Sequence, residues 1–434
     1  MTDILFFIEH RVREFDAAAA IKRHLEARHG LSTIVAAVGQ REEPAIANAR
    51  PQMVVLPWAR NAETWSVLRS IVNTYPRAVF FDMCWEQILL SHVVEAKAPK
   101  GRFAKERVLH HTWGSFRTEY LKQQGIPAER IFENGNPLYT LYLERYRGLY
   151  PVRAELAARH NLDPNKPWVL FPENYGWSFL SEAQIRKRFV RKGLSEERAF
   201  ENRRFQIESR RAAFEWFSGI NGPIEFILRP RPAITAAAYQ AAFESEGIVP
   251  GKSVRIIKDG PVREWIHAAD LVMSSFSTTL LEAAIAGKPA FAIEPVPFVA
   301  DIGDVEWVQQ LDRVTSREAF EELLRDPRSV PPTRRSANFA RGIAHSCDDA
   351  LIGAADIIKR ILDSQRGVQI EPYIIPEPPM EKFKRFRRRA REWLGLPKRT
   401  KPFETAKSER LSDAEVESRT AQVDALFARE KVLA

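Results

Sequence analysis

The chain is poor in cysteine, and this scarcity argues against a disulfide-stabilised fold. Its 434 residues include only Cys84 and Cys347, which stand far apart and match no metal-binding or redox spacing. A secreted fold held by disulfides is therefore disfavoured, and a reducing compartment is expected. The chain also lacks a basic region and a cleavage site before the strand-like segment at residues 4–8, so we expect no signal peptide.

Long apolar runs and cofactor motifs are missing as well. No stretch reaches the roughly 18 uninterrupted apolar residues of a membrane-spanning helix. No glycine-rich dinucleotide fingerprint or Gly-Lys-Ser/Thr phosphate loop follows a strand-like segment, and no His-Glu-x-x-His pattern occurs. Nicotinamide, ATP and zinc chemistry are therefore disfavoured. We expect no metal and no cofactor other than a nucleotide-linked substrate.

The positive charge is concentrated in one segment. Residues 382–401 carry a net charge of +9, which equals the charge of the whole chain, so the remainder sums to about zero. Aromatic residues alternate with the cations there, which suits an anionic membrane surface better than nucleic acid, although a solvated charged helix is the simpler alternative. The expected membrane-contact residues are Lys384, Arg385, Arg387, Arg388, Arg389 and Trp393.

Strand-like and helix-like segments alternate along the chain. Repeated βα units predict two α/β domains, each with a doubly wound, mainly parallel sheet. We expect domains at residues 1–150 and 163–365, followed by a proline-rich linker and a basic helical tail at 366–434. Expected strands are 4–8, 32–38, 53–56, 78–81 and 108–111, then 168–171, 224–228, 254–257, 271–273 and 290–293. Expected helices are 15–29, 58–75, 115–124, 184–217, 315–324, 348–362 and an exposed one at 412–434.

The most informative segment is 270–294, DLVMSSFSTTLLEAAIAGKPAFAIE, which is typical of a strand, a hydroxyl-rich loop, a helix and a second strand. Thr279 and Glu282 fit a capping box at the helix start. Because a helix start offers unpaired N–H groups, it suits a phosphate, and Glu282 could reach a ribose. A purely structural role for the serines as helix caps is the alternative. The residues predicted to donate hydrogen bonds to the phosphate are Ser274, Ser275, Ser277, Thr278 and Thr279.

Polar residues also follow two other strands of the second domain. Arg229 and Arg231, in the sequence Arg-Pro-Arg-Pro, could form forked contacts to a phosphate. Glu173 and Asn174 follow the strand at 168–171 and are expected in the same cleft, because ligands of open α/β sheets lie at the carboxyl ends of strands. A surface salt bridge and an ordinary polar loop are the respective alternatives.

In the first domain, Asp82 and Glu86 follow the fourth expected strand, beside Trp85. A carboxylate next to a large aromatic ring is a candidate general base for a sugar hydroxyl, whereas helix capping by Asp82 is the alternative. The charged residues after the first strand predict a loop for an anionic acceptor. The expected acceptor or cleft residues are Glu9, Arg11, Arg13, Glu14, Trp113 and Asn136.

The order of these motifs resembles bacterial surface carbohydrate biosynthesis proteins with a GT-B glycosyltransferase architecture. The resemblance covers about residues 3–360 and rests on ILFFIEHRVREFDAAAAIKRHLEARHG, FFDMCWEQ, WGSFRTEYLKQQGIPAERIFENGNP, VLFPENYGWSF, RPRP and the serine-rich segment. Transferases of 3-deoxy-manno-octulosonic acid (Kdo) are similar in style. In those families a His-Pro element and a serine cluster hold the nucleotide phosphate, and here Arg231-Pro232 stands where His-Pro is usual.

The resemblance implies two Rossmann-like domains facing a cleft, with the acceptor on the first and the nucleotide sugar on the second. It implies a metal-independent glycosyltransferase of capsule or lipopolysaccharide assembly, using a CMP-linked keto-sugar acid and a glycan or lipid-linked acceptor, at the inner face of the cytoplasmic membrane. A GT-B sugar-nucleotide epimerase, a CDP-polyol phosphotransferase and a non-catalytic membrane-associated assembly factor are the alternatives.

Overall fold

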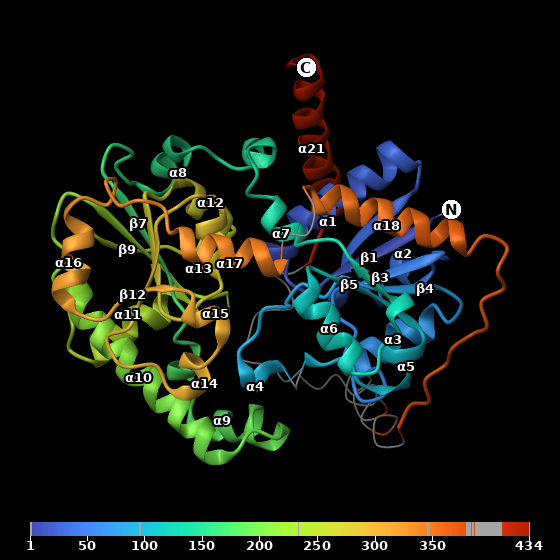
Figure 1. Ribbon diagram of the computed structural model, residues 1–434, viewed down its shortest axis with the longest axis horizontal. Coiled ribbons are helices and arrows are strands. Elements are labelled where there is room, and N and C mark those ends of the chain that lie inside the picture. Colours follow the sequence, from blue (N-terminus) through green and yellow to red (C-terminus); the bar gives the residue numbers. More distant parts are fainter. Residues whose placement is uncertain are drawn as a thin grey trace. The chain divides into compact units, whose positions relative to one another are not determined.

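The structure, a computed structural model, describes residues 2–94, 97–232, 234–344, 348–378 and 410–433, together with Phe383 and Phe386. It divides into two compact units (Figure 1). The first unit comprises residues 1–87, 97–140 and 345–434, and the second comprises residues 88–96 and 141–344.

The described strands of the first unit form a parallel sheet in the order β2-β1-β3-β4-β5-β6. The direction in which successive strands are added reverses between β1 and β3, so the sheet has its topological switch point there. The strands are β1 (Ile4–Ile8), β2 (Thr33–Ala37), β3 (Met53–Leu56), β4 (Val79–Asp82), β5 (Val108–Thr112) and the unexpected β6 (Ile131–Glu133).

Helices cover the first sheet because its central strands are buried on both faces, as in other parallel sheets. On one face, Leu5, Val54 and Phe80 pack against helix α3, which begins at Ser66. The predicted helix at 58–75 was therefore wrong at its start, and residues 58–65 form a loop. The helices are α1 (Arg11–His29), α2 (Pro44–Ala47), α3 (Ser66–Thr74), α5 (Gly101–Glu106), α6 (Ser115–Gln123), α7 (Pro137–Thr140), α18 (Ala350–Ser364) and α21 (Asp413–Leu433).

The described strands of the second unit form a parallel sheet in the order β12-β11-β10-β7-β8-β9, with its switch point between β7 and β10. The strands are β7 (Trp168–Pro172), β8 (Glu225–Arg229), β9 (Val254–Ile256), β10 (Leu271–Ser274), β11 (Ala290–Ile293) and the unexpected β12 (Asp312–Val314). The helices are α4 (Ser91–Val94), α8 (Arg153–His160), α9 (Glu182–Arg188), α10 (Glu196–Ser218), α11 (Ala236–Ser245), α12 (Val262–Ala268), α13 (Thr279–Ile285), α14 (Ala300–Gly303), α15 (Glu306–Gln309), α16 (Arg317–Arg325) and α17 (Arg334–Ala344).

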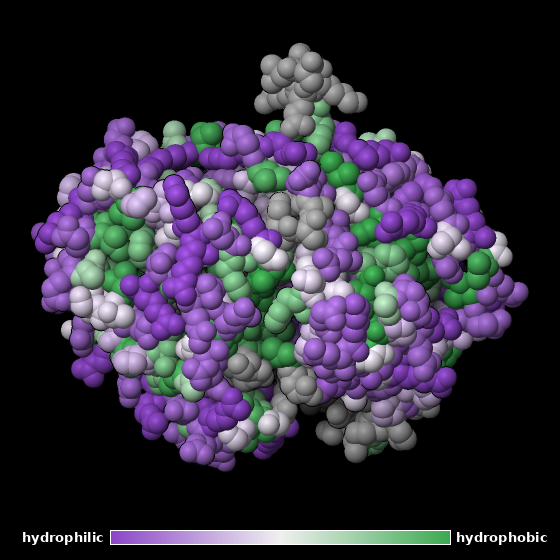
Figure 2. All heavy atoms as spheres, in the orientation of Figure 1, coloured by the Kyte–Doolittle hydropathy of each residue, from purple (hydrophilic) through white to green (hydrophobic). Residues whose placement is uncertain are grey.

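One face of the second sheet carries an aromatic core. Alternate strand residues such as Phe171 and Phe226 pack against Phe217 of α10 and Phe320 of α16. The predicted helix at 184–217 is two helices, since Gly193 adopts a φ of 108° and ends the turn after α9. The faces visible in Figure 2 are mostly hydrophilic on each unit, as expected when most large apolar side chains are buried in such cores.

The C-terminal part of the chain returns to the first unit, which differs from the predicted domain boundary at residue 365. Helix α18 packs against α1. Helix α21 also packs on α1: Val423 is fully buried, Arg23 pairs with Asp424 at 2.6 Å, and the ring of Phe427 meets that of His24 edge-on. The mostly exposed helix expected at 412–434 is present, and one side of it packs on α1 while most of its described residues are exposed.

No helix among the described residues is long and apolar enough to cross a membrane. The predicted membrane-contact residues, Lys384, Arg385, Arg387, Arg388, Arg389 and Trp393, lie outside the described residues, so that role stays a prediction. Their described neighbours Phe383 and Phe386 are exposed.

Candidate functional site

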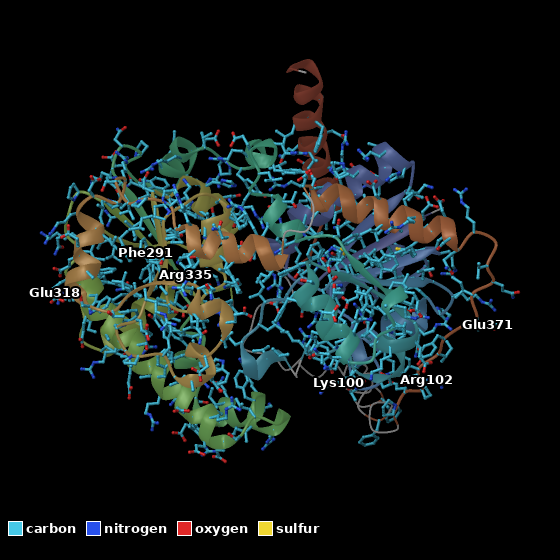
Figure 3. The ribbon with its side chains drawn as sticks, in the orientation of Figure 1. Lys100, Arg102, Phe291, Glu318, Arg335 and Glu371 are labelled. Atoms are coloured by element: carbon cyan, nitrogen blue, oxygen red, sulfur yellow. The ribbon has the colours of Figure 1, made fainter. Side chains whose placement is uncertain are left out.

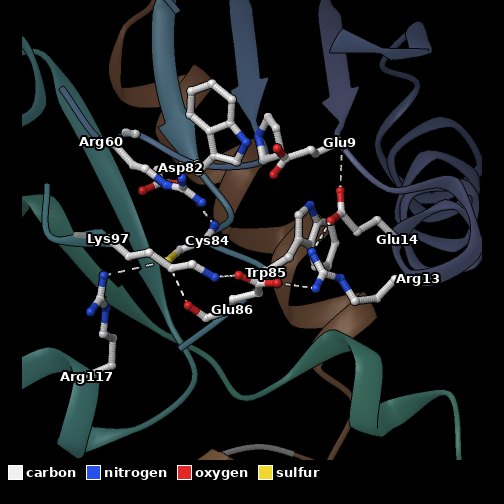
Figure 4. Close-up of a pocket in the computed structure, with 13 residues that line it drawn as sticks. Glu9, Arg13, Glu14, Arg60, Asp82, Cys84, Trp85, Glu86, Lys97 and Arg117 are labelled. Atoms are coloured by element: carbon white, nitrogen blue, oxygen red, sulfur yellow. Dashed lines mark hydrogen bonds and ion pairs between the residues drawn. The ribbon is translucent and has the colours of Figure 1, made fainter. Parts of the chain in front are cut away.

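A pocket lies at the carboxyl ends of β1, β3 and β4 in the first unit, next to the switch point of the sheet (Figure 4). Open α/β sheets bind ligands at this position because the loops on either side diverge there. The pocket encloses about 370 Å³, including space open to solvent. Its lining residues are Glu9, Arg13, Glu14, Pro57, Trp58, Ala59, Arg60, Asp82, Cys84, Trp85, Glu86, Lys97 and Arg117.

Glu86 is one of two partly exposed carboxylates that line this pocket, the other being Glu9. The side chain of Glu86 is one-third exposed and forms ion pairs with Arg13 of α1 and with Lys97. These two ion pairs fix the position of the carboxylate at the pocket wall. Glu14 is buried, pairs with Arg13 at 2.9 Å and accepts the backbone N–H of Glu9 at 2.7 Å, so it orients the arginine.

Asp82 is held inside the fold. Its Oδ1 accepts the backbone N–H of Cys84 at 2.9 Å, and its Oδ2 lies 3.3 Å from Nδ1 of His110. The first contact stabilises the turn after β4, where Cys84 has a φ of 44°, a left-handed value that is costly for a residue other than glycine. Asp82 therefore shapes the pocket floor, and of the two predicted bases Glu86 is the better placed.

Lys97, Arg60 and Arg117 are pocket residues that sequence reasoning missed. Burial and the positive charges of Arg60 and Arg13 lower the pKa of Lys97 to about 7. Arg60 was missed because residues 58–75 were predicted to be a helix. Its position in the sequence between Trp58 and Trp65, whose rings it contacts, could have indicated a role in the pocket.

Three predicted acceptor residues do not line this pocket. Arg11 pairs with Glu415 of α21. Trp113 is buried, and its backbone N–H donates to Gln87 Oε1 at 2.9 Å. Asn136 is fully buried, and its Oδ1 accepts the backbone N–H of Leu138 at 2.9 Å. These contacts give all three a structural role, and their predicted contact with an acceptor is unsupported.

In the second unit, the loops after β7, β8 and β10 meet beside the other switch point. Asn174 Nδ2 donates to the backbone carbonyl of Phe276 at 2.9 Å, which joins the loops after β7 and β10. Glu173 is 4% exposed and accepts the backbone N–H groups of Tyr175 and, at 3.3 Å, Arg231. Burial raises the pKa of Glu173 to about 7, although the charge of Arg231 and both backbone donors oppose the shift.

The two predicted phosphate-binding arginines differ in environment. Arg229 is buried, and its guanidinium donates to the backbone carbonyls of Asp259, at 2.6 Å, and Gly260. Arg231 is exposed, and no ion pair joins its guanidinium to a carboxylate among the described residues. Its guanidinium lies over Gly176, where an added Cβ would approach Nη1 to 2.7 Å. Arg231 is therefore the arginine available to a ligand.

The hydroxyl-rich loop is only partly open to a ligand. The Ser274 hydroxyl is buried and donates to the carbonyl of Pro172. The buried Ser275 hydroxyl lies beside Tyr175. Ser277 donates to Thr279 Oγ1 at 3.0 Å, and Thr278 is half-buried beside it.

The predicted capping box of Thr279 and Glu282 was wrong. The residue preceding α13 is Thr278, and its side chain makes no capping hydrogen bond. Thr279 is the first helical residue, and its N–H meets Ser277 Oγ at 3.3 Å. Glu282 accepts a hydrogen bond from the Tyr142 hydroxyl at 2.8 Å. A ribose would have to compete with this tyrosine for the carboxylate. With only seven residues, α13 contributes a small dipole, and a phosphate here would depend on Arg231.

The raised pKa of Glu173 leads to a test of its burial. The folded protein holds a proton between about pH 4.3 and pH 7 that the unfolded chain releases, so the stability from Glu173 is complete below pH 4 and is lost as the pH rises through 7. We expect the unfolding free energy of the wild type to fall by on the order of 3 kcal/mol between pH 5 and 8, and this fall to be absent in Glu173→Gln. Urea denaturation at each pH measures both. The control Glu371→Gln, at an exposed site in the first unit (Figure 3), should show the wild-type dependence of unfolding free energy on pH. The same dependence in Glu173→Gln would contradict a raised pKa of Glu173.

Among the described residues, no group of three His, Cys, Asp or Glu side chains is arranged to hold a metal ion. The groups named in the two sites are instead carboxylates, hydroxyls, lysine and arginine. Such groups can transfer protons and bind anions.

Comparisons with solved structures identify the fold. A variant of the wall teichoic acid polymerase TagF has a TM-score of 0.54 at 13% identity, over 85% of this chain and 90% of that one. A second TagF variant, soaked with CDPG, has a TM-score of 0.54 at 14% identity, over 84% and 90%. A protein described as a UDP-N-acetylglucosamine 2-epimerase, from Listeria monocytogenes, has a TM-score of 0.50 at 12% identity, over 86% of this chain and 99% of that one.

No protein-family model and no curated protein sequence matches the chain. At 12–14% identity the structural likeness shows the fold alone, which is the two-domain GT-B type with two parallel sheets. The predicted fold class is thereby confirmed. The resemblance to Kdo transferases receives no support from these structures.

Proposed function

We propose that the protein is a GT-B enzyme of surface glycan biosynthesis that transfers a sugar from a nucleotide-activated donor to an acceptor hydroxyl. The observation that carries this proposal is the pocket at the switch point of the first sheet, where Glu86 lies between two cations at the carboxyl ends of the strands. The TagF variant soaked with CDPG adds support, since it has the same fold and was soaked with a compound of that kind.

In the proposed reaction Glu86 takes the proton of the acceptor hydroxyl, and the resulting oxygen attacks the anomeric carbon of the donor sugar. The bond between that carbon and the nucleotide phosphate oxygen breaks, and the phosphate leaves with the bonding electrons. Arg231 stabilises the negative charge on the departing phosphate. It cannot donate a proton near neutral pH, because a guanidinium stays charged, so the leaving group must be a good one without protonation.

The donor nucleotide can be identified by a thermal-shift titration of the full-length protein with CMP, CDP, UDP and GDP. A hundredfold excess over the dissociation constant should stabilise the protein by about 2.7 kcal/mol. A selective response to CMP would support a keto-sugar acid such as Kdo, whereas a response to CDP would favour a polyol phosphate donor. A folded protein that responds to none of the four would contradict the proposal and favour a non-catalytic assembly factor.

The epimerase alternative rests on the fold shared with the Listeria protein. An epimerase converts its nucleotide sugar without an acceptor, whereas the proposed transferase requires one. Product analysis after incubation with the donor alone therefore separates the two functions, and turnover without acceptor would replace our proposal with the alternative.

A further inference from the structure

Arg117 is a buried cation with an incomplete set of partners. It lies on α6, and the residue is 5% exposed. Its Nη2 is 3.7 Å from the sulfur of Cys84, and its Nε has no hydrogen-bond partner among the described residues. Its guanidinium also lies 4.8 Å from the ring of Tyr120. Buried charges in proteins are normally paired with an opposite charge, because removing an ion from water is costly. The described part of the chain supplies no carboxylate to this arginine.

Arg60 is a second cation of the same pocket without a carboxylate partner in the described residues. Its guanidinium lies 4.8 Å from the ring of Trp65 and 5.5 Å from that of Trp58. Such contacts hold the side chain in place but do not neutralise it. Arg60 is close enough to Lys97 to lower the pKa of that residue, which places both cations in one electrostatic environment.

The carboxylates of the pocket do not neutralise these two arginines. Glu14 pairs with Arg13, and Glu86 pairs with Arg13 and Lys97. Asp82 contacts His110 and the backbone of Cys84.

Oε2 of Glu9 lies 4.0 Å from Nε2 of His10, a ring whose pKa is lowered by burial and by the charge of Arg13. The pocket therefore has ion pairs around Glu86, whereas no described carboxylate pairs with the guanidinium groups of Arg60 and Arg117. Figure 4 shows Cys84 between Asp82 and Arg117.

We propose that Arg60 and Arg117 bind a phosphate group of the acceptor, beside the Glu86 that activates its hydroxyl. Two guanidinium groups match the charge of a phosphate monoester and can each form forked hydrogen bonds to its oxygens, whereas a carboxylate would match only one. This inference deepens the proposed function and rests on it, since it takes the first unit as the acceptor-binding unit. Lys97 would gain its proton when the phosphate arrives, because an adjacent anion favours the ammonium form.

The test is calorimetric titration of the full-length protein with inorganic phosphate, at constant ionic strength and without donor or acceptor. Arg60→Met and Arg117→Met should each weaken phosphate binding about tenfold or more, since each removes charge-assisted hydrogen bonds. The matched control is Arg102→Met, which removes an exposed cation of the first unit outside the pocket (Figure 3) and should bind like the wild type. Acetate should bind at least tenfold more weakly than phosphate.

Each remaining outcome would overturn the inference. Equal binding of acetate would indicate a carboxylate site, and unchanged phosphate binding in Arg60→Met would exclude the proposed contact even if Arg117→Met fails to fold. Loss of all phosphate binding in Arg231→Ala would place the phosphate in the second unit instead. Because no turnover is measured, arginine-dependent binding would persist if the transferase proposal failed, so the two failures can be told apart.

Discussion

Glu86→Gln is expected to lower kcat by about 10²- to 10⁴-fold, the usual contribution of a positioned general base. The amide has nearly the same shape as the carboxylate and can still face Arg13 and Lys97, but it cannot take the proton of the acceptor hydroxyl. The measurement is steady-state turnover with the donor whose nucleotide stabilises the protein, together with the thermal midpoint. The midpoint should change little, because Glu86 is one-third exposed and surface ion pairs contribute weakly to stability.

The matched control is Glu106→Gln, which removes an exposed carboxylate of α5 that pairs with Arg102. This variant should retain wild-type turnover. A Glu86→Gln enzyme that keeps more than a tenth of wild-type kcat would show that another group accepts the proton. Lys97 would then be the next residue to test, because its pKa of about 7 suits a base near neutral pH.

Arg231→Ala is expected to lower kcat by about 10²- to 10³-fold, the loss typical of removing one group that stabilises charge in the transition state. The phosphate leaves as an anion, and Arg231 is the exposed guanidinium at the carboxyl end of β8. Arg231→Lys should recover part of the loss by restoring the charge without the forked geometry. Turnover and the dissociation constant of the nucleotide should be measured together.

Arg335→Ala serves as control, because this exposed arginine of α17 lies outside both sites and donates to Gln310 Oε1 at 3.2 Å (Figure 3). Gly176→Ala provides an independent route to the same site, since the added Cβ would displace the guanidinium of Arg231 without removing its charge. Full activity in Arg231→Ala would exclude this residue from the stabilisation of the leaving group.

Much of the fold followed from local patterns in the sequence. Strands such as Ile4–Ile8 and Ala290–Ile293 were predicted at their observed positions, because apolar runs bounded by turn residues are typical of buried parallel strands. The three-residue strands β6 and β12 were missed because so short a strand leaves little periodic signal, although the equally short β9 was predicted. The loop at residues 58–65 was mistaken for helix because its tryptophans imitate an apolar helix face.

The candidate site was predicted in part for the same reason. Glu9, Arg13, Glu14, Asp82 and Glu86 directly follow strands β1 and β4, so their place at one edge of the sheet could be inferred from the chain alone. Arg60, Lys97 and Arg117 come from a loop, a connecting segment and α6, and no local pattern relates them.

The sequence by itself determined the alternation of strands and helices, from which parallel sheets were predicted, and the position of polar residues at strand ends. Strand and helix signals depend on neighbours only a few residues away. The tertiary structure alone decided which charges are matched. Arg11 pairs with Glu415, 404 residues later in the chain, and Arg229 is bound by the carbonyls of a distant loop, whereas Arg117 is buried without a described carboxylate. Burial and pairing depend on contacts between distant segments, and those contacts exist only once the sheets have formed.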